Sequence, residues 1–212
     1  MISTKAWKVF SSALALAVVL AVSTLLSPAA SAYDGNAAAT YADTWATSRN
    51  GAYPDFGPDC TNFVSQALSA GSFPMRGGTD AQNPNEWWIR TNIWNTWDYA
   101  TTWSVAARLR QFMINIYPGG ISKGTAYGEG AGTYTPVGEI TGDLIVMDWG
   151  RGEGLSHAAI QVGTGVDPVK SMYGNLIDQH TNDHYHAIWN LKPYNLDYKT
   201  TTFYFEHIQA NN

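Results

Sequence analysis

The order of its hydrophobic patterns is the feature that most constrains the fold of this chain. Apolar residues recur at helical spacing in the first half, and short β-rich runs follow from Asp143 onward. The predicted helices cover 36–49, a segment that starts at Cys60, and a segment marked by apolar residues from Val105 to Ile116. The predicted strands cover 144–147, 157–162, 175–181 and 203–208, and the Gly-rich segment 119–135 is expected to be a loop. Helices followed by strands predict an α+β domain, in which N-terminal helices pack on one face of an antiparallel β-sheet.

The N-terminus has the pattern of a secretory signal peptide. Lys5 and Lys8 precede an apolar stretch over 13–26, and the small residues Ala30-Ser31-Ala32 follow it. This pattern predicts cleavage after residue 32, export, and a mature protein that starts near Tyr33 without a membrane anchor. The apolar stretch is shorter than the ~20 residues that span a bilayer. We therefore expect a signal peptide over 1–32 and one domain over 33–212, acting as a secreted monomer.

Charge and cysteine content exclude some partners and some ways of stabilising the fold. The chain has 12 basic and 17 acidic residues, and the predicted leader removes two lysines and no acid. The resulting acidic balance makes nucleic acid a poor partner. One cysteine cannot form a disulfide within the chain, so the fold must depend on its hydrophobic core.

Cys60 lies where a helix is expected to begin, in the stretch PDCTNFVSQAL. Unpaired N–H groups and the helix dipole stabilise a thiolate at this position, and Asp59 is a natural N-cap. His157 opens an apolar strand and is the candidate that activates the thiol, because a Cys–His pair is the minimal unit of thiol acyl transfer. The alternative interpretation is a small, buried, inert thiol and a histidine that merely ends a strand.

Several motifs together resemble a known family. They are RNGAYPDFGPDCTNFVSQALSAG, NPNEWW, GDLIVMDW, SHAAIQV and QHTND. This combination is similar to the secreted "putative amidase domain" family of the papain-like clan, which is related to the NlpC/P60 and CHAP cell-wall hydrolases. The resemblance covers roughly 35–196. It implies a papain-like α+β fold, an activated Cys60, His157 as general base, and cleavage of an amide or peptide bond.

A third group should accept a hydrogen bond from His157 and fix its tautomer. Asp178 and His180 are the candidates. If 167–170 forms a two-residue turn that closes a hairpin, His157 faces position 180. A β-bulge at 173–175 would shift the register by one residue. The QHTND resemblance also favours His180, so we predict His180 and keep Asp178 as the alternative.

Other residues could bind the substrate. The N–H of Cys60 is the natural first donor to an oxyanion. Papain has a glutamine six residues before its cysteine, whereas this chain has Pro54 there, so we suggest the Tyr53 hydroxyl as a second donor. Trp87 and Trp88 could line a cleft or stack on a sugar, although a buried structural cluster explains them without any ligand.

These observations favour a cysteine amidase or peptidase that acts on peptide or peptidoglycan-type substrates of the cell wall and needs no cofactor. A set of three histidines, His180, His184 and His186, could bind a metal, but no zinc motif supports this and we predict no metal site. Two alternatives remain open. One is an extracellular module that binds glycan without catalysis, and the other is a cross-linking enzyme that transfers the acyl group to an amine.

Overall fold

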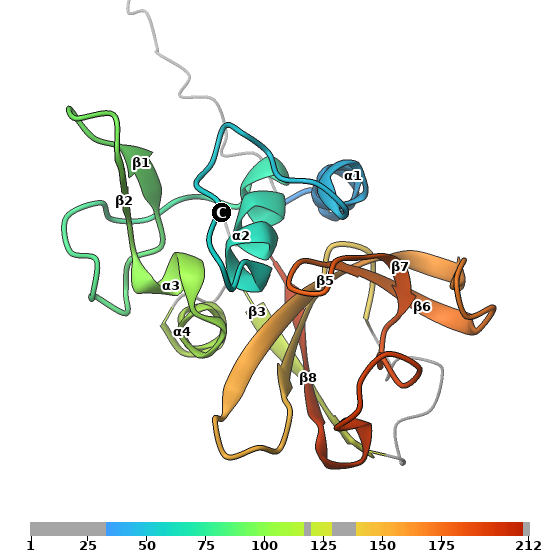
Figure 1. The fold of residues 1–212 in the computed structure, drawn as a ribbon. Coiled ribbons are helices and arrows are strands. Elements are labelled where there is room, and N and C mark those ends of the chain that lie inside the picture. Colours follow the sequence, from blue (N-terminus) through green and yellow to red (C-terminus); the bar gives the residue numbers. More distant parts are fainter. Residues whose placement is uncertain (1–32, 117–119, 129–138, 210–212) are drawn as a thin grey trace, which may run out of the picture.

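The computed structural model describes residues 33–116, 120–128 and 139–209 (Figure 1). The predicted signal peptide over 1–32 lies outside the described residues. Within the described ranges, no helix combines the length and the apolar character needed to cross a bilayer.

The N-terminal half is helical, as predicted, but the first helix ends earlier than expected and the third is divided into two short helices. The helices are α1 (Gly35–Trp45), α2 (Cys60–Ala70), α3 (Thr101–Ser104) and α4 (Ala106–Gln111), followed by the π-helical turn η1 (Phe112–Ile116). Asp34 begins α1 by accepting hydrogen bonds from the N–H groups of Asn36 and Ala37. Val105 has an extended backbone, which separates α3 from α4.

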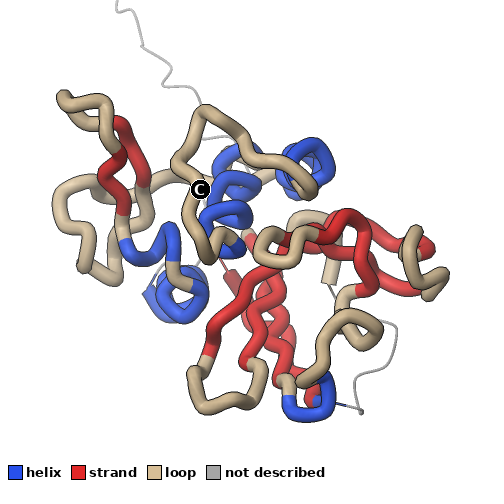
Figure 2. Tube along the Cα trace, in the orientation of Figure 1, coloured by secondary structure: helices blue, strands red, loops and turns tan. Residues whose placement is uncertain are grey.

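A six-stranded antiparallel sheet forms the second half, which confirms the α+β prediction. Its strands are β3 (Gly120–Tyr127), β4 (Leu144–Asp148), β5 (Leu155–Val166), β6 (Tyr173–Gln179), β7 (His184–Ile188) and β8 (Thr202–Ile208). Their spatial order is β3-β8-β4-β5-β6-β7. Figure 2 shows α1 to α4 gathered on one side of this sheet, whereas the short 3-10 helix η3 (Tyr198–Thr200) lies at its foot.

The predicted loop over 119–135 is wrong for residues 120–127. These residues form β3, which pairs with β8 along its whole length, with a register shift between Ser122 and Gly124. Residues 129–135 of that predicted loop lie outside the described residues. Glycines are frequent in this segment, and two of them, Gly120 and Gly124, lie in the strand itself, where glycine is unfavourable and weakens the sequence signal.

The sheet is buried on both faces. On β4, Leu144 and Val146 pack toward the helices, whereas Ile145 and Met147 belong to a second apolar cluster with Phe205. The alternation follows from the two-residue period of a strand. The helices cover one face, and β7 with the segment that leads to β8 supplies Trp189, Leu191 and Tyr198 to the other.

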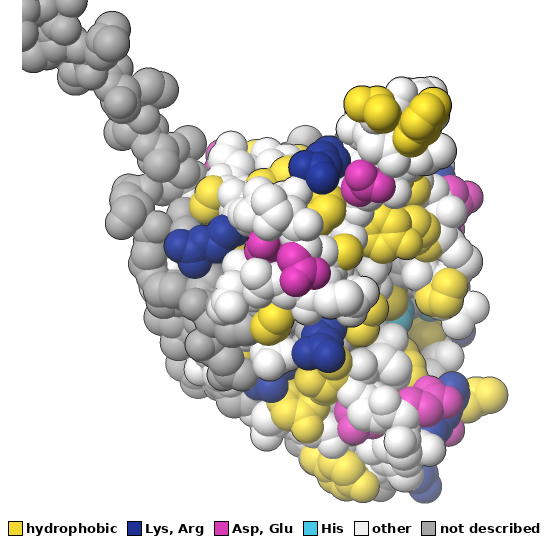
Figure 3. Space-filling model, turned by 90° about the vertical axis from the view of Figure 1, so that its left-hand side faces the viewer, with side chains coloured by type: hydrophobic (Ala, Val, Ile, Leu, Met, Phe, Trp, Pro, Cys, Tyr) yellow, Lys and Arg dark blue, Asp and Glu magenta, His cyan; other side chains and the backbone are white. Residues whose placement is uncertain are grey.

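A small hairpin lies beside the helices, away from the main sheet. It consists of β1 (Ile89–Thr91) and β2 (Trp97–Tyr99), paired in antiparallel register. The turn between them exposes Ile93 and Trp94, and apolar side chains are visible at the top of the face in Figure 3. On this face, basic and acidic side chains are interspersed and neither sign forms a continuous patch.

Candidate active site

Cys60 and His157 come together in a cavity between α2 and β5. Cys60 is the first residue of α2, as predicted, and His157 is the third residue of β5. Both line a cavity of about 560 Å³. Its other lining residues include Trp149, Arg151, Gln179, Thr181, Asn182, His184, Tyr194 and Asn195. The sequence prediction that these two residues are neighbours is therefore correct in space.

The environment of Cys60 favours the thiolate. Burial alone would raise the pKa of this thiol, but hydrogen bonding and charge from His157 act in the opposite direction. The Thr61 hydroxyl, 3.7 Å from Sγ, and the backbone N–H of Ala158 add to the effect of His157. Together these groups lower the pKa of Cys60 to about 7, compared with about 8.5 for a free cysteine.

Gln179 contacts the other side of the His157 ring. Its Oε1 lies 2.9 Å from Nε2 of His157, and its Nε2 donates to the carbonyl of Asn182 at 3.2 Å. The second bond fixes the amide orientation, so His157 must donate from Nε2. Its Nδ1 is then free of a proton and can accept the one from Cys60. Trp149 packs against this ring, with centroids 5.0 Å apart.

The prediction that His180 or Asp178 contacts His157 is wrong, because the hairpin register differs from the expected one. The turn after β5 is longer than two residues, so Val166 pairs with Tyr173, and Asp167 does not pair with Lys170. A bulge at Val162, between Gln161 and Gly163, then shifts the register by one residue. This bulge lies on β5 and not at 173–175, and it brings Gln179 to the site.

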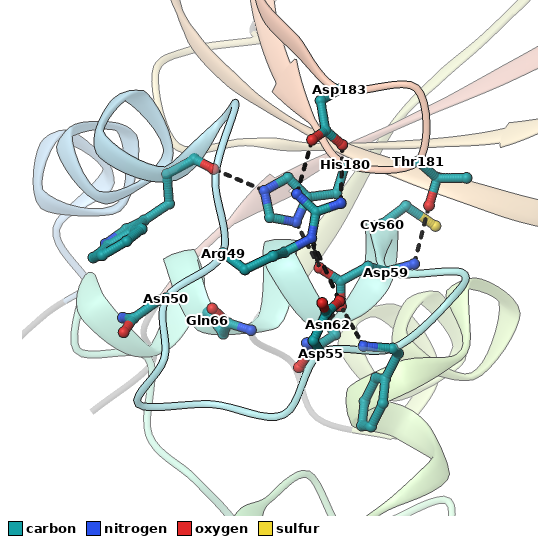
Figure 4. A network of polar contacts seen from close by, with 12 residues as sticks. Arg49, Asn50, Asp55, Asp59, Cys60, Asn62, Gln66, His180, Thr181 and Asp183 are labelled. Atoms are coloured by element: carbon teal, nitrogen blue, oxygen red, sulfur yellow. Dashed lines mark hydrogen bonds and ion pairs between the residues drawn. The ribbon is translucent and has the colours of Figure 1, made fainter.

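His180 belongs to a neighbouring buried network (Figure 4). Its Nδ1 lies 2.6 Å from Oδ2 of Asp59, and its Nε2 lies 2.8 Å from the carbonyl of Trp45. Arg49 also approaches Oδ2 of Asp59, at 3.2 Å, and forms two hydrogen bonds with Asp183. This network joins the end of α1, the start of α2 and the end of β6.

Asp59 occupies the predicted N-cap position of α2, but its side chain does not cap the helix. Its Oδ1 accepts a hydrogen bond from Asn62 at 2.7 Å, and its backbone N–H donates to Thr181 at 3.0 Å. Asn62 also donates to the Pro54 carbonyl and accepts from Trp103. The charge of Asp59 is thus compensated by Arg49 and turned away from the thiol, as Figure 4 shows.

Asp178 lies on the strand face opposite to Gln179. It is fully buried, and its Oδ1 accepts a 2.6 Å hydrogen bond from the N–H of His186. Burial, and then the nearby Asp43 carboxylate, raise the pKa of Asp178 to about 8. This residue does not contact His157, so it cannot orient that ring.

The remaining predicted residues are part of the core and not of the cavity wall. Tyr53 stacks between Trp97 and Trp103 with centroids 6.2 and 6.1 Å away, so the suggested role of its hydroxyl as oxyanion donor has no geometric support. Trp87 is fully buried and donates to Ser65, whereas Trp88 is nearly buried and donates to Glu86. The cleft-lining interpretation of Trp87 and Trp88 is therefore wrong.

The three histidines of the discarded metal hypothesis do not converge. His180 contacts Asp59, whereas His184 lines the cavity and packs on Tyr194. His186 contacts Asp43 instead.

Comparison with known proteins identifies the class of this domain. Residues 32–205 match the family described as "putative amidase domain", and the chain belongs to this family. The chain therefore contains an amidase-like domain, and amidases are a class of hydrolases. A stretch of 90 residues is 37% identical to the "uncharacterized protein YhbB" of Bacillus subtilis (strain 168). That match covers 41% of this chain and 26% of the Bacillus protein. No solved structure matches the chain.

Proposed function

We propose that this protein is a secreted cysteine amidase of papain-like type that cleaves an amide bond in cell-wall peptides. The observation that carries the proposal is the Cys60 thiol, whose pKa is lowered to about 7 next to His157 in an accessible cavity. A thiol kept only for packing has no need of this arrangement, and perturbed nucleophiles in cavities are candidate functional sites.

The geometry supports a definite sequence of proton transfers. His157 takes the thiol proton at Nδ1, and the Cys60 thiolate attacks the carbonyl carbon of the scissile amide. The backbone N–H of Cys60 is oriented by the start of α2 and has no partner within the helix, so it can donate to the developing oxyanion. His157 then gives its proton to the leaving nitrogen, which departs as an amine and leaves a thioester on Cys60. Water, activated by the same imidazole, hydrolyses this thioester and regenerates the thiol.

The cavity supports a peptide better than a glycan as the ligand. Stacking of Trp87 and Trp88 on a sugar would require exposed rings, but both side chains are in the core. The cavity itself combines polar side chains such as Asn182 and Asn195 with the apolar Leu191 and Leu196. A mixed lining of this kind suits the backbone and short side chains of a peptide stem. The choice of cell-wall peptides as substrate rests on the predicted export together with the resemblance to cell-wall hydrolases.

The test is to incubate the purified protein with peptidoglycan fragments and with a general peptide library, and to read products by mass spectrometry. We expect release of peptides with a mass gain of one water at the cleaved bond, and no release by the Cys60→Ala variant. Products joined to an added amine, without hydrolysis, would instead indicate the acyl-transfer alternative. Cleavage by Cys60→Ala at the rate of the unchanged protein would refute the proposal.

The predicted export has its own test. N-terminal sequencing of the exported protein should give a sequence that begins at Tyr33.

A further inference from the structure

A second cluster of ionisable side chains lies outside the cavity, where α1 packs against the edge of the sheet. It consists of Asp43 on α1, Asp178 on β6 and His186 on β7. One side-chain oxygen or nitrogen from each residue lies within 4.8 Å of the other two. Neither Cys60 nor His157 belongs to this cluster.

One carboxylate oxygen of Asp178 has no hydrogen-bond partner in the cluster. Its Oδ1 accepts a hydrogen bond from His186, but its Oδ2 is buried and accepts none from the residues that the structure describes. Native proteins rarely leave a buried carboxylate oxygen without a partner, because its lost hydration is then not replaced. Glu206 on β8 is also buried and has an oxygen, Oε2, that is unpaired among the described residues, but its Oε1 lies 2.6 Å from Nε of Arg110, so a cation already compensates its charge. Asp143, just before β4, is a second contrast. It is as deeply buried, but both of its oxygens have donors, from Ile140 and from His207 with Ile208.

The charges in the cluster also require compensation. The carboxyl groups of Asp43 and Asp178 lie close together, and no Lys or Arg forms an ion pair with either among the described residues. Nε2 of His186 lies 2.8 Å from Oδ1 of Asp43. Two adjacent carboxylates cannot both remain charged unless a proton or a cation lies between them.

We propose that Asp43, Asp178 and His186 bind a divalent transition-metal cation, with Zn²⁺ as the best match. Two carboxylate oxygens and one imidazole nitrogen are a donor set that Zn²⁺ accepts, whereas Mg²⁺ and Ca²⁺ prefer oxygen ligands alone. Bonds of about 2.0 to 2.2 Å hold ligand atoms roughly 3 to 4 Å apart, a spacing that the partly exposed Asp43 can reach by side-chain rotation. Water can complete the coordination from the exposed side.

The bound cation would join three elements at the edge of the molecule. It connects α1 to β6 and β7, and β6 continues from Asp178 directly into Gln179, which contacts His157. The site is therefore structural, and it lies on the strand face opposite to the active site. Ligand binding to the folded state alone raises the apparent stability of the protein.

The experiment uses the full mature chain with the Cys60→Ala substitution, because a thiol–imidazole pair can itself bind zinc. After EDTA treatment and dialysis, Zn²⁺ is titrated by calorimetry and the melting temperature is measured with and without the metal. We expect about one Zn²⁺ per chain, a higher melting temperature in its presence, and a much smaller effect of Mg²⁺ at the same concentration.

Three variants and one control make the assignment specific. Asp43→Asn, Asp178→Asn and His186→Asn should each weaken Zn²⁺ binding at least tenfold and remove the thermal shift. Asparagine also tolerates the left-handed backbone of His186, which has φ 55°. Asp98→Asn is the matched control, because its carboxylate is 42% exposed compared with 40% for Asp43, and it should bind Zn²⁺ normally.

Two results would overturn the proposal. One is the absence of zinc binding and of a thermal shift, which would mean that a shared proton compensates the two carboxyl groups. The other is binding that persists unchanged in Asp43→Asn, a partly exposed substitution that should not disturb folding.

Discussion

At the residue scale, the acidity of Cys60 depends on a few groups that overcome its burial. A buried thiol surrounded by apolar groups has a raised pKa and is inert. Cys60 differs because His157, Thr61 and the Ala158 N–H all stabilise the charged form. The same contacts hold Sγ beside the nitrogen that is to accept its proton, so acidity and geometry have one origin.

Substitution of Gln179 tests the orientation of the His157 ring while leaving the nucleophile and the base in place. Gln179→Ala removes the acceptor for Nε2 of His157, so the ring can adopt the wrong tautomer. We expect kcat to fall roughly 100-fold with little change in KM, because only the transition state loses an interaction. The measurement is steady-state kinetics on a peptide identified as substrate.

Gln179→Glu is the matched variant for this prediction, since a carboxylate still accepts the Nε2 hydrogen. It should keep clearly more activity than Gln179→Ala. Equal activity in the unchanged protein and Gln179→Ala would show that His157 is oriented by other means.

Cys60 and His157 could be predicted from the sequence because few residue types can serve as nucleophile and base. Gln179 could not, although it stands next to His180 in the motif QHTND. Its amide does not titrate, so it carries no chemical signature in the sequence. Its role arises from its position beside His157 and from the hydrogen bond to Asn182 that turns its oxygen toward the ring.

At the element scale, the register between β5 and β6 decides which side chain reaches the site. A single extra residue on β5, Val162, determines whether position 179 or 180 faces His157. Such a bulge has no reliable sequence signal, because an extended residue looks the same inside or outside a regular ladder. The strands β5 and β6 were therefore predictable, and their register was not.

His180 should stabilise the packing between elements and should not affect the orientation of His157. Its ring connects Asp59 to the Trp45 carbonyl and stacks on Phe63 at 4.0 Å. His180→Ala leaves a buried charge with one partner fewer, and should lower the free energy of unfolding by about 3 kcal/mol. Urea denaturation monitored by circular dichroism measures this loss.

Gln179→Ala serves as the control in the same assay, because the two hydrogen bonds that it removes, with His157 and with the Asn182 carbonyl, involve no carboxylate. Its free energy of unfolding should fall by about 1 kcal/mol, clearly less than that of His180→Ala. If His180→Ala retained full stability while abolishing turnover, the network would be catalytic and this interpretation would be wrong.

Local interactions also explain which helices and strands could be predicted. The strong patterns over 36–49 and after Cys60 gave helices, although α1 ends early, at Trp45. The apolar spacing after Val105 predicted one helix, but the extended backbone of Val105 places it between two short ones. The strand β3 was missed because its sequence is Gly-rich and its pairing with β8 is a long-range interaction.

At the scale of the whole molecule, the sheet separates two apolar clusters and places the candidate site at the boundary between helices and sheet. The helical half contributes the nucleophile and the sheet contributes the base and its orienting amide (Figure 1). Docking of the two halves therefore assembles the site, whereas neither half contains it alone.

Removal of metal should lower the stability of the molecule but not its catalytic turnover. The proposed cation site at Asp43 is structural, and the proposed reaction uses a thiol. EDTA should therefore lower the melting temperature but leave turnover nearly unchanged at temperatures well below the transition. Assays of turnover and melting on the same EDTA-treated sample test this. Loss of turnover at low temperature, with recovery on adding Zn²⁺, would contradict a metal-independent thiol mechanism.

The most direct test of the central claim is the pH dependence of Cys60 alkylation in the native protein. The thiolate is the reactive form, so the rate of iodoacetamide labelling should fall as the pH falls through about 7, and be near its maximum at pH 8. His157→Ala should move this midpoint upward, because burial is then opposed only by the Thr61 hydroxyl and the Ala158 N–H. Labelling that requires denaturant, or a midpoint that His157→Ala does not change, would contradict the account of Cys60 as a nucleophile activated by His157.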